Sequence, residues 1–332
     1  MIVSITERPE YKRCRRKWNL GSRNRENLTP IIPATALSLG TYVHAALAAW
    51  MQDQSKPAKH YFLQTASIAR AQAIKTYYQQ VGAVISDSEV NRIDDAIVMG
   101  AFMCENYEKH WTAPLPPDFT VVTQEQRVLV PIPNTEHTEE WIYDRLKKEA
   151  VLVKYDTPRL HYVSGKFDGV IEDSRGRLYV LERKTYNQRP REEVLRSNDQ
   201  FLGYTWMLKQ LGLPGRVAGV AYDGLWKRDH VPTKVDGRNG KLSDLFIRMR
   251  IERPPEELAE FEQELAWEVM EMASNPHITK HRTSDGSCFW GCDYEKLCAA
   301  MSRGEDVDYV IKSRFVLRPD ENQDSDSDSD AA

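Results

Sequence analysis

The sequence of 332 residues has no apolar run long enough to cross a bilayer, and its first residues, MIVSITERPEYKRCRRKW, lack the apolar core of a signal peptide. It also lacks internal repeats and the G-x4-G-K-[ST] phosphate loop of ATP-driven motors. We therefore expect a cytoplasmic protein with no membrane partner. Any ATP-driven step would therefore have to be supplied by another chain.

Cysteine is scarce, with five residues in the chain. In a reducing compartment such cysteines are free, metal-bound or catalytic more often than disulfide-bonded. The composition is otherwise ordinary for a globular protein, with 41% hydrophobic and 28% charged residues. A chain of this length can bury a sizeable core in one large domain or two.

The net charge of −4 conceals two opposite ends. The last residues, PDENQDSDSDSDAA (319–332), hold six acidic residues and no basic one, so that residues 1–318 carry a net charge of +2. This low-complexity composition predicts a disordered acidic tail. Near the other end, KRCRRK (12–17) has five basic residues, which is compatible with a polyanionic partner.

Hydrophobic periodicity predicts helices first and strands afterwards. Residues 35–52 have apolar side chains at helical spacing, and further helices are expected at about 59–81 and 87–111. Cys104 lies in the last of these helices and is most simply a core thiol. The segment FTVVTQEQRVLVPI, from residue 119, has the β-branched content and alternation of a strand.

The second half of the chain contains a predicted hairpin. HYVSGKFDGVIED (161–173) and RLYVLERKTY (177–186) read as strands joined by the tight-turn sequence Ser174-Arg175-Gly176. The charged residues 134–150 fit either an insertion or a short helix. The remaining expected elements are a helix at 195–212, a strand at 216–222, an edge strand at 245–253 and a helix after Pro254-Pro255.

The hairpin carries a set of charged residues that fits metal-dependent hydrolysis. Strand alternation puts Glu182 and Lys184 on one face of LERKTY, and antiparallel pairing can bring Asp168 close to Glu182. Two such carboxylates repel each other unless a cation lies between them, and Mg²⁺ or Mn²⁺ accept carboxylates together with phosphate oxygens. A neighbouring lysine can orient the attacking water. A solvent-facing ion pair is the simpler alternative for Glu182 and Lys184.

Three further side chains accompany this set. Gln200 and Tyr204 are four residues apart in DQFLGYTWML and hence share a helix face. His44 lies in SLGTYVHAALAAW, an otherwise apolar helical segment. A lone histidine in that setting is more often a core residue than a ligand.

Taken in order, His44, GKFD ending at Asp168, ERK at 182–184 and Q-x3-Y at 200–204 resemble the motifs of the PD-(D/E)XK nucleases. Within them the sequence is most similar to the RecB-like branch that includes the CRISPR-associated "Cas-four" exonucleases and their phage relatives. The resemblance implies that His44, Asp168 and Glu182 bind Mg²⁺ or Mn²⁺ and that Lys184 is catalytic together with the two acids. It also implies that Gln200 and Tyr204 contact DNA. For a phage-encoded chain the expected location is inside the host cell.

A second metal centre is expected from the cysteines. CFWGCDYEKLC places Cys288, Cys292 and Cys298 close together, and a fourth ligand is available in Cys14 or Cys104. The basic neighbours of Cys14 favour its thiolate. The same nuclease branch holds a [4Fe–4S] cluster between one cysteine near the N-terminus and three near the C-terminus, which implies Cys14 as the fourth ligand. Relatives commonly have C-x2-C where this chain has C-x3-C, and zinc remains the alternative metal.

The predicted fold is α/β, with a mixed central sheet flanked by helices, as in the restriction-endonuclease-like PD-(D/E)XK core. We predict one nuclease domain (1–318) made of a helical lobe (35–111), a catalytic sheet core (119–252) and a C-terminal helix with the iron–sulfur segment (254–300). The resemblance suggests a single-strand-specific DNA exonuclease, running 5′ to 3′, in recombination, repair or DNA processing. The alternatives are a nuclease subunit that needs a helicase or recombination partner, and a non-catalytic iron–sulfur DNA-binding protein.

Overall fold

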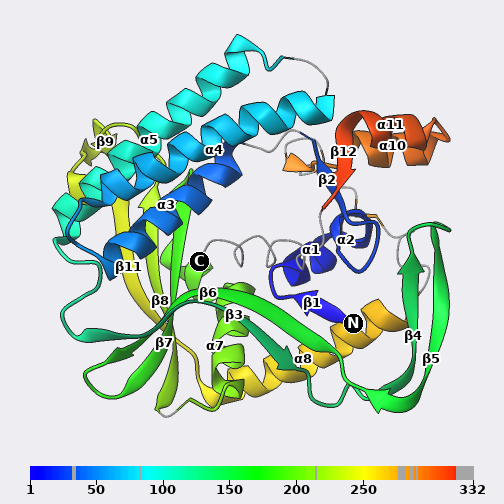
Figure 1. Cartoon of the computed structure of the whole chain (residues 1–332). Helices are drawn as coiled ribbons and strands as arrows, with labels where there is room; N and C mark the ends of the chain where they lie inside the picture. Colours follow the sequence, from blue (N-terminus) through cyan, green and yellow to red (C-terminus); the bar gives the residue numbers. More distant parts are fainter. Residues whose placement is uncertain are drawn as a thin grey trace, which may run out of the picture. The chain divides into compact units, whose positions relative to one another are not determined.

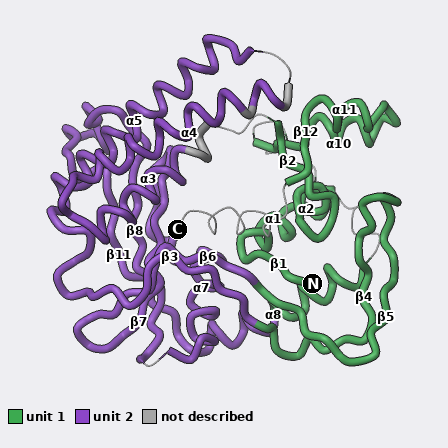
Figure 2. Tube along the Cα trace, viewed as in Figure 1, with its two compact units in different colours: residues 1–32, 131–163, 264–332 green, residues 33–130, 164–263 purple. Residues whose placement is uncertain are grey.

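The computed structural model describes residues 1–31, 35–81, 84–213, 215–275, 282–283, 288 and 291–318. The chain forms two compact units, which are coloured separately in Figure 2. Unit 1 comprises residues 1–32, 131–163 and 264–332, and unit 2 comprises residues 33–130 and 164–263. The predicted acidic tail, residues 319–332, lies outside the described residues, and the single-domain boundaries stay a prediction.

Unit 2 is built on a mixed sheet with the strand order β6-β7-β8-β11, to which β3 adds by pairing with β6 (Figure 1). β6 and β7 are antiparallel, β7 and β8 are parallel, and β8 and β11 are antiparallel. The strands of unit 2 are β3 (Phe119–Pro131), β6 (Tyr162–Asp173), β7 (Arg177–Tyr186), β8 (Arg216–Trp226), β9 (Lys234–Val235), β10 (Arg238–Asn239) and β11 (Phe246–Glu252).

Helices cover both faces of this sheet, and their bounds follow the sequence patterns closely. On one face Met51 of α3 packs against Tyr179 and Leu181 of β7, and on the other Tyr204 of α7 contacts Phe167 of β6. The helices are α3 (Thr35–Gln52), α4 (Ala58–Val81), α5 (Asp87–Trp111), α6 (Glu192–Arg196), α7 (Asp199–Gln210), the 3₁₀ helix η1 (Leu242–Leu245) and α8 (Pro255–Ser274), whose second half belongs to unit 1. The predicted α/β fold with a mixed, helix-flanked sheet is confirmed.

Unit 1 gathers segments that are far apart in the sequence. Two of its short strand pairs are β2 with β12 and β4 with β5, both antiparallel, and β1 pairs with the first residues of β6, which belong to this unit. Its elements are β1 (Ile2–Ser4), α1 (Glu7–Arg13), α2 (Arg15–Gly21), β2 (Leu28–Pro30), β4 (His137–Asp144), β5 (Glu149–Arg159), α10 (Glu295–Arg303), α11 (Val307–Arg314) and β12 (Phe315–Leu317).

The short helix allowed for residues 134–150 is wrong, since this segment forms β4 and the start of β5. Its charges are compatible with strands because the hairpin is exposed along much of its length. The single helix expected at 195–212 is divided into α6 and α7. The division lies at Asn198, whose side chain caps α7 by accepting from the backbone N–H groups of Gln200 and Phe201. None of the helices in the described part of the chain has the length and apolar character needed to cross a membrane.

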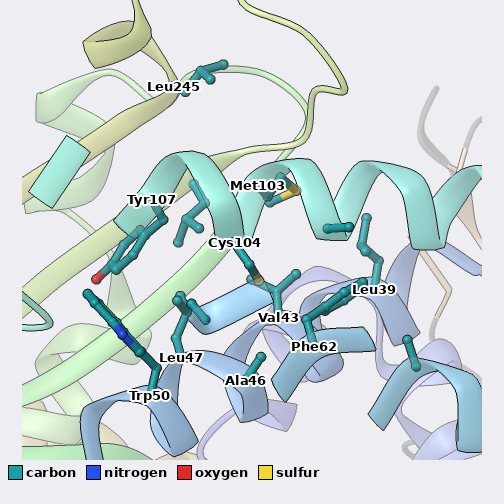
Figure 3. Packing of buried hydrophobic residues seen from close by; sticks show 14 of the residues in the cluster. Leu39, Val43, Ala46, Leu47, Trp50, Phe62, Met103, Cys104, Tyr107 and Leu245 are labelled. Atoms are coloured by element: carbon teal, nitrogen blue, oxygen red, sulfur yellow. The ribbon is translucent and has the colours of Figure 1, made fainter. Parts of the chain in front are cut away.

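In unit 2, α3, α4 and α5 pack against one another around a hydrophobic core, which is shown in Figure 3. Cys104 of α5 is fully buried in this core, close to Val43 and Phe62, which confirms it as a core thiol. Burial also raises the pKa of this thiol, which keeps it protonated. Gly100 lies one turn earlier in α5, where a Cβ atom would overlap the Phe62 ring.

We expect Gly100→Ala to destabilise the protein, because the added methyl group meets an aromatic ring inside a packed core. Overpacking of this kind costs about 1–3 kcal/mol, which thermal or denaturant unfolding would measure. Shortening the opposing side chain in the double variant Gly100→Ala/Phe62→Leu should recover part of the loss. A Gly100→Ala protein as stable as the parent would show that α4 and α5 are packed differently.

Candidate active site

The β6–β7 hairpin brings Asp168 and Glu182 together where the two strands separate. Gly169 pairs with Leu181 in the antiparallel register, so the next pair along the strands would be Asp168 with Glu182. The Asp168 carboxylate instead turns toward β7 and accepts a hydrogen bond of 2.6 Å from the backbone N–H of Arg183. The predicted proximity of Asp168 and Glu182 is therefore present.

Glu182 is deeply buried, because β7 is covered on both faces. The residue is 3% exposed, and its carboxylate lies 2.6 Å from the ammonium group of Lys184. Burial raises the pKa of Glu182 to about 8, and the positive charge of Lys184 offsets this only in part. The Lys184 side chain is 40% exposed. The pair is thus no solvent-facing ion pair, since its acidic member has almost no contact with water.

His44 approaches the same place from α3. Gly40 precedes it by one turn and lies so close to β7 that a Cβ atom would be 2.9 Å from the Thr185 hydroxyl oxygen. His44 Nδ1 lies 3.7 Å from the Asp168 carboxylate. Burial lowers the pKa of His44, which favours the neutral imidazole that metals bind.

Gln200 and Tyr204 share one face of α7, as predicted. The Gln200 side-chain amide donates a hydrogen bond of 2.9 Å to the Tyr204 hydroxyl oxygen. Burial raises the pKa of Tyr204, and the nearby Glu182 raises it further. The pair is therefore next to the acidic residues, although Tyr204 itself is almost fully buried.

A buried charged network behind the site was missed by sequence reasoning. Arg183 points to the opposite face from Glu182, is 1% exposed, and its guanidinium group contacts the sulfur of Met51. Asp223 is its direct neighbour on β8 and accepts a hydrogen bond from the hydroxyl of Tyr107. Arg248 of β11 donates to the same hydroxyl oxygen over 2.6 Å. The signal in the sequence that could have indicated this network is the presence of charged residues within otherwise apolar strands.

The donor set fits a divalent cation in its chemistry. His44 Nε2 is buried and has no hydrogen-bond partner among the described residues, and the neighbouring carboxylates provide hard oxygen ligands. In the described part of the chain, however, the ligand atoms of His44, Asp168 and Glu182 do not all lie within 4.8 Å of one another. Binding of one ion by all three residues therefore requires at least one of these side chains to move.

The four cysteines proposed as cluster ligands all belong to unit 1. Cys14 has an extended backbone between α1 and α2, and Cys298 lies on α10, where its sulfur accepts a hydrogen bond of 3.4 Å from Arg16. Burial raises the pKa of the Cys292 thiol, and the nearby Cys288 and Cys14 contribute to the shift. The chain thus brings Cys14 into the neighbourhood of the C-terminal trio, whereas Cys104 is in the core of unit 2.

A family model described as the PD-(D/E)XK nuclease superfamily matches residues 2–299, which is nearly the whole chain. No curated protein matches the chain by sequence. The family match spans residues of both units, including the hairpin that carries Asp168, Glu182 and Lys184. It names no branch of the superfamily, so the RecB-like, "Cas-four" subtype stays a prediction.

Metal binding should compete with a proton on Glu182. Because burial raises the pKa of this carboxyl to about 8, a proton competes with a bound cation there over the neutral range. The apparent Mn²⁺ affinity should then increase with pH, by up to about tenfold per unit, and level off above the raised pKa. Calorimetric titrations between about pH 6 and 9 would measure this. Glu182→Gln should weaken binding and remove the slope, and an affinity that does not change with pH in the parent protein would contradict the assignment.

Proposed function

Because the chain belongs to the PD-(D/E)XK nuclease superfamily, whose members are metal-dependent nucleases, we propose that it hydrolyses phosphodiester bonds of DNA at the site described above. The observation that carries the proposal is the buried Glu182 carboxylate next to Lys184 and Asp168 in unit 2. Burying the negative charge of a carboxylate is costly unless a proton or a cation compensates it, and a metal ion is such a cation. The resemblance to the RecB-like branch supports an exonuclease that prefers single strands and runs 5′ to 3′, in recombination, repair or DNA processing.

The proposed roles follow from position and charge. Asp168, Glu182 and His44 hold Mg²⁺ or Mn²⁺, which when bound supplies Lewis-acid stabilisation of the negative charge on the phosphate. Lys184 orients the attacking water and balances phosphate charge once its ion pair with Glu182 opens. Gln200 and Tyr204 position the DNA strand next to the acids. Water adds to the phosphorus and the ester oxygen leaves as a hydroxyl with the proton that the water gives up.

We further propose that Cys14, Cys288, Cys292 and Cys298 hold a [4Fe–4S] cluster. The support is the break between α1 and α2 at Cys14 and the electrostatic influence of Cys14 and Cys288 on Cys292. Tyr294 lies between Cys292 and Cys298 in the sequence, and its hydroxyl donates to the backbone oxygen of Leu28, so the segment is fixed to β2. A cluster here would join residues from the two ends of the sequence within one unit.

Digestion of end-labelled DNA tests the proposed reaction. Single- and double-stranded substrates labelled at either the 5′ or the 3′ end, with Mn²⁺ or Mg²⁺, report activity, polarity and strand preference together. Stepwise release of label from single strands is expected. Release only after a helicase is added would favour the nuclease-subunit alternative, and binding without cleavage would favour the non-catalytic one.

Lys184→Ala should remove nearly all cleavage, by roughly 100-fold or more, while leaving metal and DNA binding largely intact. The lysine acts mainly in the transition state, so the loss should appear in turnover. The matched control is Lys109→Ala, which breaks an exposed ion pair with Glu105 on α5 and should keep parent activity. A folded Lys184→Ala protein that degrades single strands at the parent rate would overturn the assignment.

Anaerobically purified protein should be brown and contain about four irons per chain, as a Cys₄-bound cluster requires. Cys14→Ser should lose the iron, because one of the four thiolates is gone. Cys104→Ser is the matched control and should keep it, since that thiol is buried between α3 and α5. A colourless protein with one zinc per chain would refute the iron cluster in favour of zinc.

A further inference from the structure

Unit 1 contains a compact group of potential metal ligands that the proposed function does not use. His137 and Glu140 lie on β4 and His161 lies just before β6. One ligand atom from each of these residues can be chosen so that all three lie within 4.8 Å of one another. The side chains of Glu140 and His161 are only 6% and 2% exposed, and that of His137 is 13% exposed. Such burial is unusual for three polar groups unless they are compensated.

Thr135 contacts both histidines, His137 through its ring and His161 through its backbone. Its backbone oxygen lies 3.0 Å from His137 Nδ1 and can only accept, so this nitrogen carries the proton. The lone pair of His137 is therefore on Nε2, which is buried and has no hydrogen-bond partner among the described residues. The Thr135 hydroxyl oxygen accepts from the backbone N–H of His161 over 3.1 Å. The ring of His137 therefore has the arrangement typical of metal-binding histidines, in which the other ring nitrogen makes a hydrogen bond, whereas the bond at His161 fixes its backbone.

Glu140 completes the group and is itself held from two sides. One carboxylate oxygen lies 3.6 Å from His137 Nε2 and accepts a hydrogen bond of 3.2 Å from the Tyr155 hydroxyl. The other lies 3.0 Å from the amino group of Met1, which also donates a hydrogen bond of 3.1 Å to His161 Nδ1, so an ion has to displace this amino group to reach that nitrogen.

The group borders a groove through which an ion and water can enter. This groove has a volume of about 780 Å³ and is lined in part by His137, Glu140, Trp141, Tyr155 and Arg159. Two of the three candidate ligands thus lie beside the groove, although their side chains are largely buried. The groove and the group both lie within unit 1.

We propose that His137, Glu140 and His161 form a second metal site, which takes a Zn²⁺-class ion with water from the groove in the fourth position. Two imidazole nitrogens and one carboxylate oxygen are a ligand set that zinc uses in open sites, whereas Mg²⁺ prefers oxygen ligands alone. The two imidazole rings are stacked, with centroids 4.0 Å apart, so one of them turns when the ion binds. His137 is the more exposed ring and has the groove beside it. The proposal does not depend on nuclease activity.

Cobalt binding by the full chain tests the site. The measurements use the iron-loaded protein with Asp168→Asn as background, so that neither the cysteines nor the proposed catalytic acids compete for the probe. We expect one Co²⁺ per chain in equilibrium dialysis. His137→Ala should lower the affinity at least ~10-fold, and Tyr155→Phe should lower it by ~10–100-fold, because it removes the hydrogen bond to Glu140.

The matched control is His230→Ala, which removes an exposed histidine next to Asp229 in unit 2 and should leave Co²⁺ binding unchanged. Zn²⁺ should raise the unfolding temperature of the background protein and leave that of its His137→Ala variant unchanged. Two results would overturn the proposal: no Co²⁺ bound in the background protein, or equal affinity in His137→Ala. The three side chains would then be a polar cluster neutralised by the amino group of Met1.

Discussion

The burial of Glu182 at the end of a strand covered on both faces is the constraint on which the site depends. β7 lies between β6 and β8 and beneath helices on either side, so its side chains exchange water for protein contacts along most of its length. The middle of the strand holds apolar residues, which tolerate this burial, whereas its last part holds charged residues. A carboxyl group in this position must hold a proton, a lysine or a metal ion. The raised pKa of Glu182 favours a proton on its carboxyl group, whereas the 2.6 Å contact with Lys184 favours the ionised form, so these two compensations compete. A cation bound to Glu182, as we propose, would replace both at once and so couple metal binding to proton release and to a free ammonium group.

The face of β7 that lies opposite to Glu182 and Lys184 also carries charged residues. Arg183 is buried there, and the negative charge of Asp223 on β8 lies beside it, held by Tyr107 and Arg248. Charges on the two faces of one strand are separated by little more than the backbone, so each face influences the other. His44 illustrates this. Burial lowers its pKa, Asp168 and Asp223 raise it, and Arg183 and Lys184 lower it again. Removing any one of these charges is therefore expected to change the protonation of groups it does not touch.

The sequence predicted elements best where local chemistry determines them. The helix bounds at 35–52 and 87–111 match α3 and α5, because apolar spacing and, for α5, the capping side chain of Ser86 are local features. The hairpin turn was equally local, with Gly176 in the left-handed region at φ +71°. The β4–β5 hairpin was missed because its strands are half-exposed and charged, so neither periodicity was clear.

The same distinction applies to the site. Asp168, Glu182 and Lys184 were found because one hairpin carries all three. The buried network behind the site joins side chains of α5, β8 and β11, and only the folded chain brings them together. Long-range pairs of this kind have no fixed spacing in the sequence, so the order of motifs along the chain does not reveal them.

The two units differ in ligand chemistry in a way that would keep different metal ions apart. Unit 2 offers carboxylates and one imidazole beside a lysine, and unit 1 offers four thiols and, at His137, Glu140 and His161, two imidazoles with a carboxylate. Zinc-class ions bind most nitrogen and oxygen sites more tightly than magnesium or manganese does, so affinity alone would favour zinc at the acids of unit 2 as well. A His₂Glu site in unit 1 has one more imidazole than the acid site, which favours zinc-class ions there. Where zinc is scarcer than the protein, the site in unit 1 would therefore take it up first and leave the acid site to the more abundant hard cations.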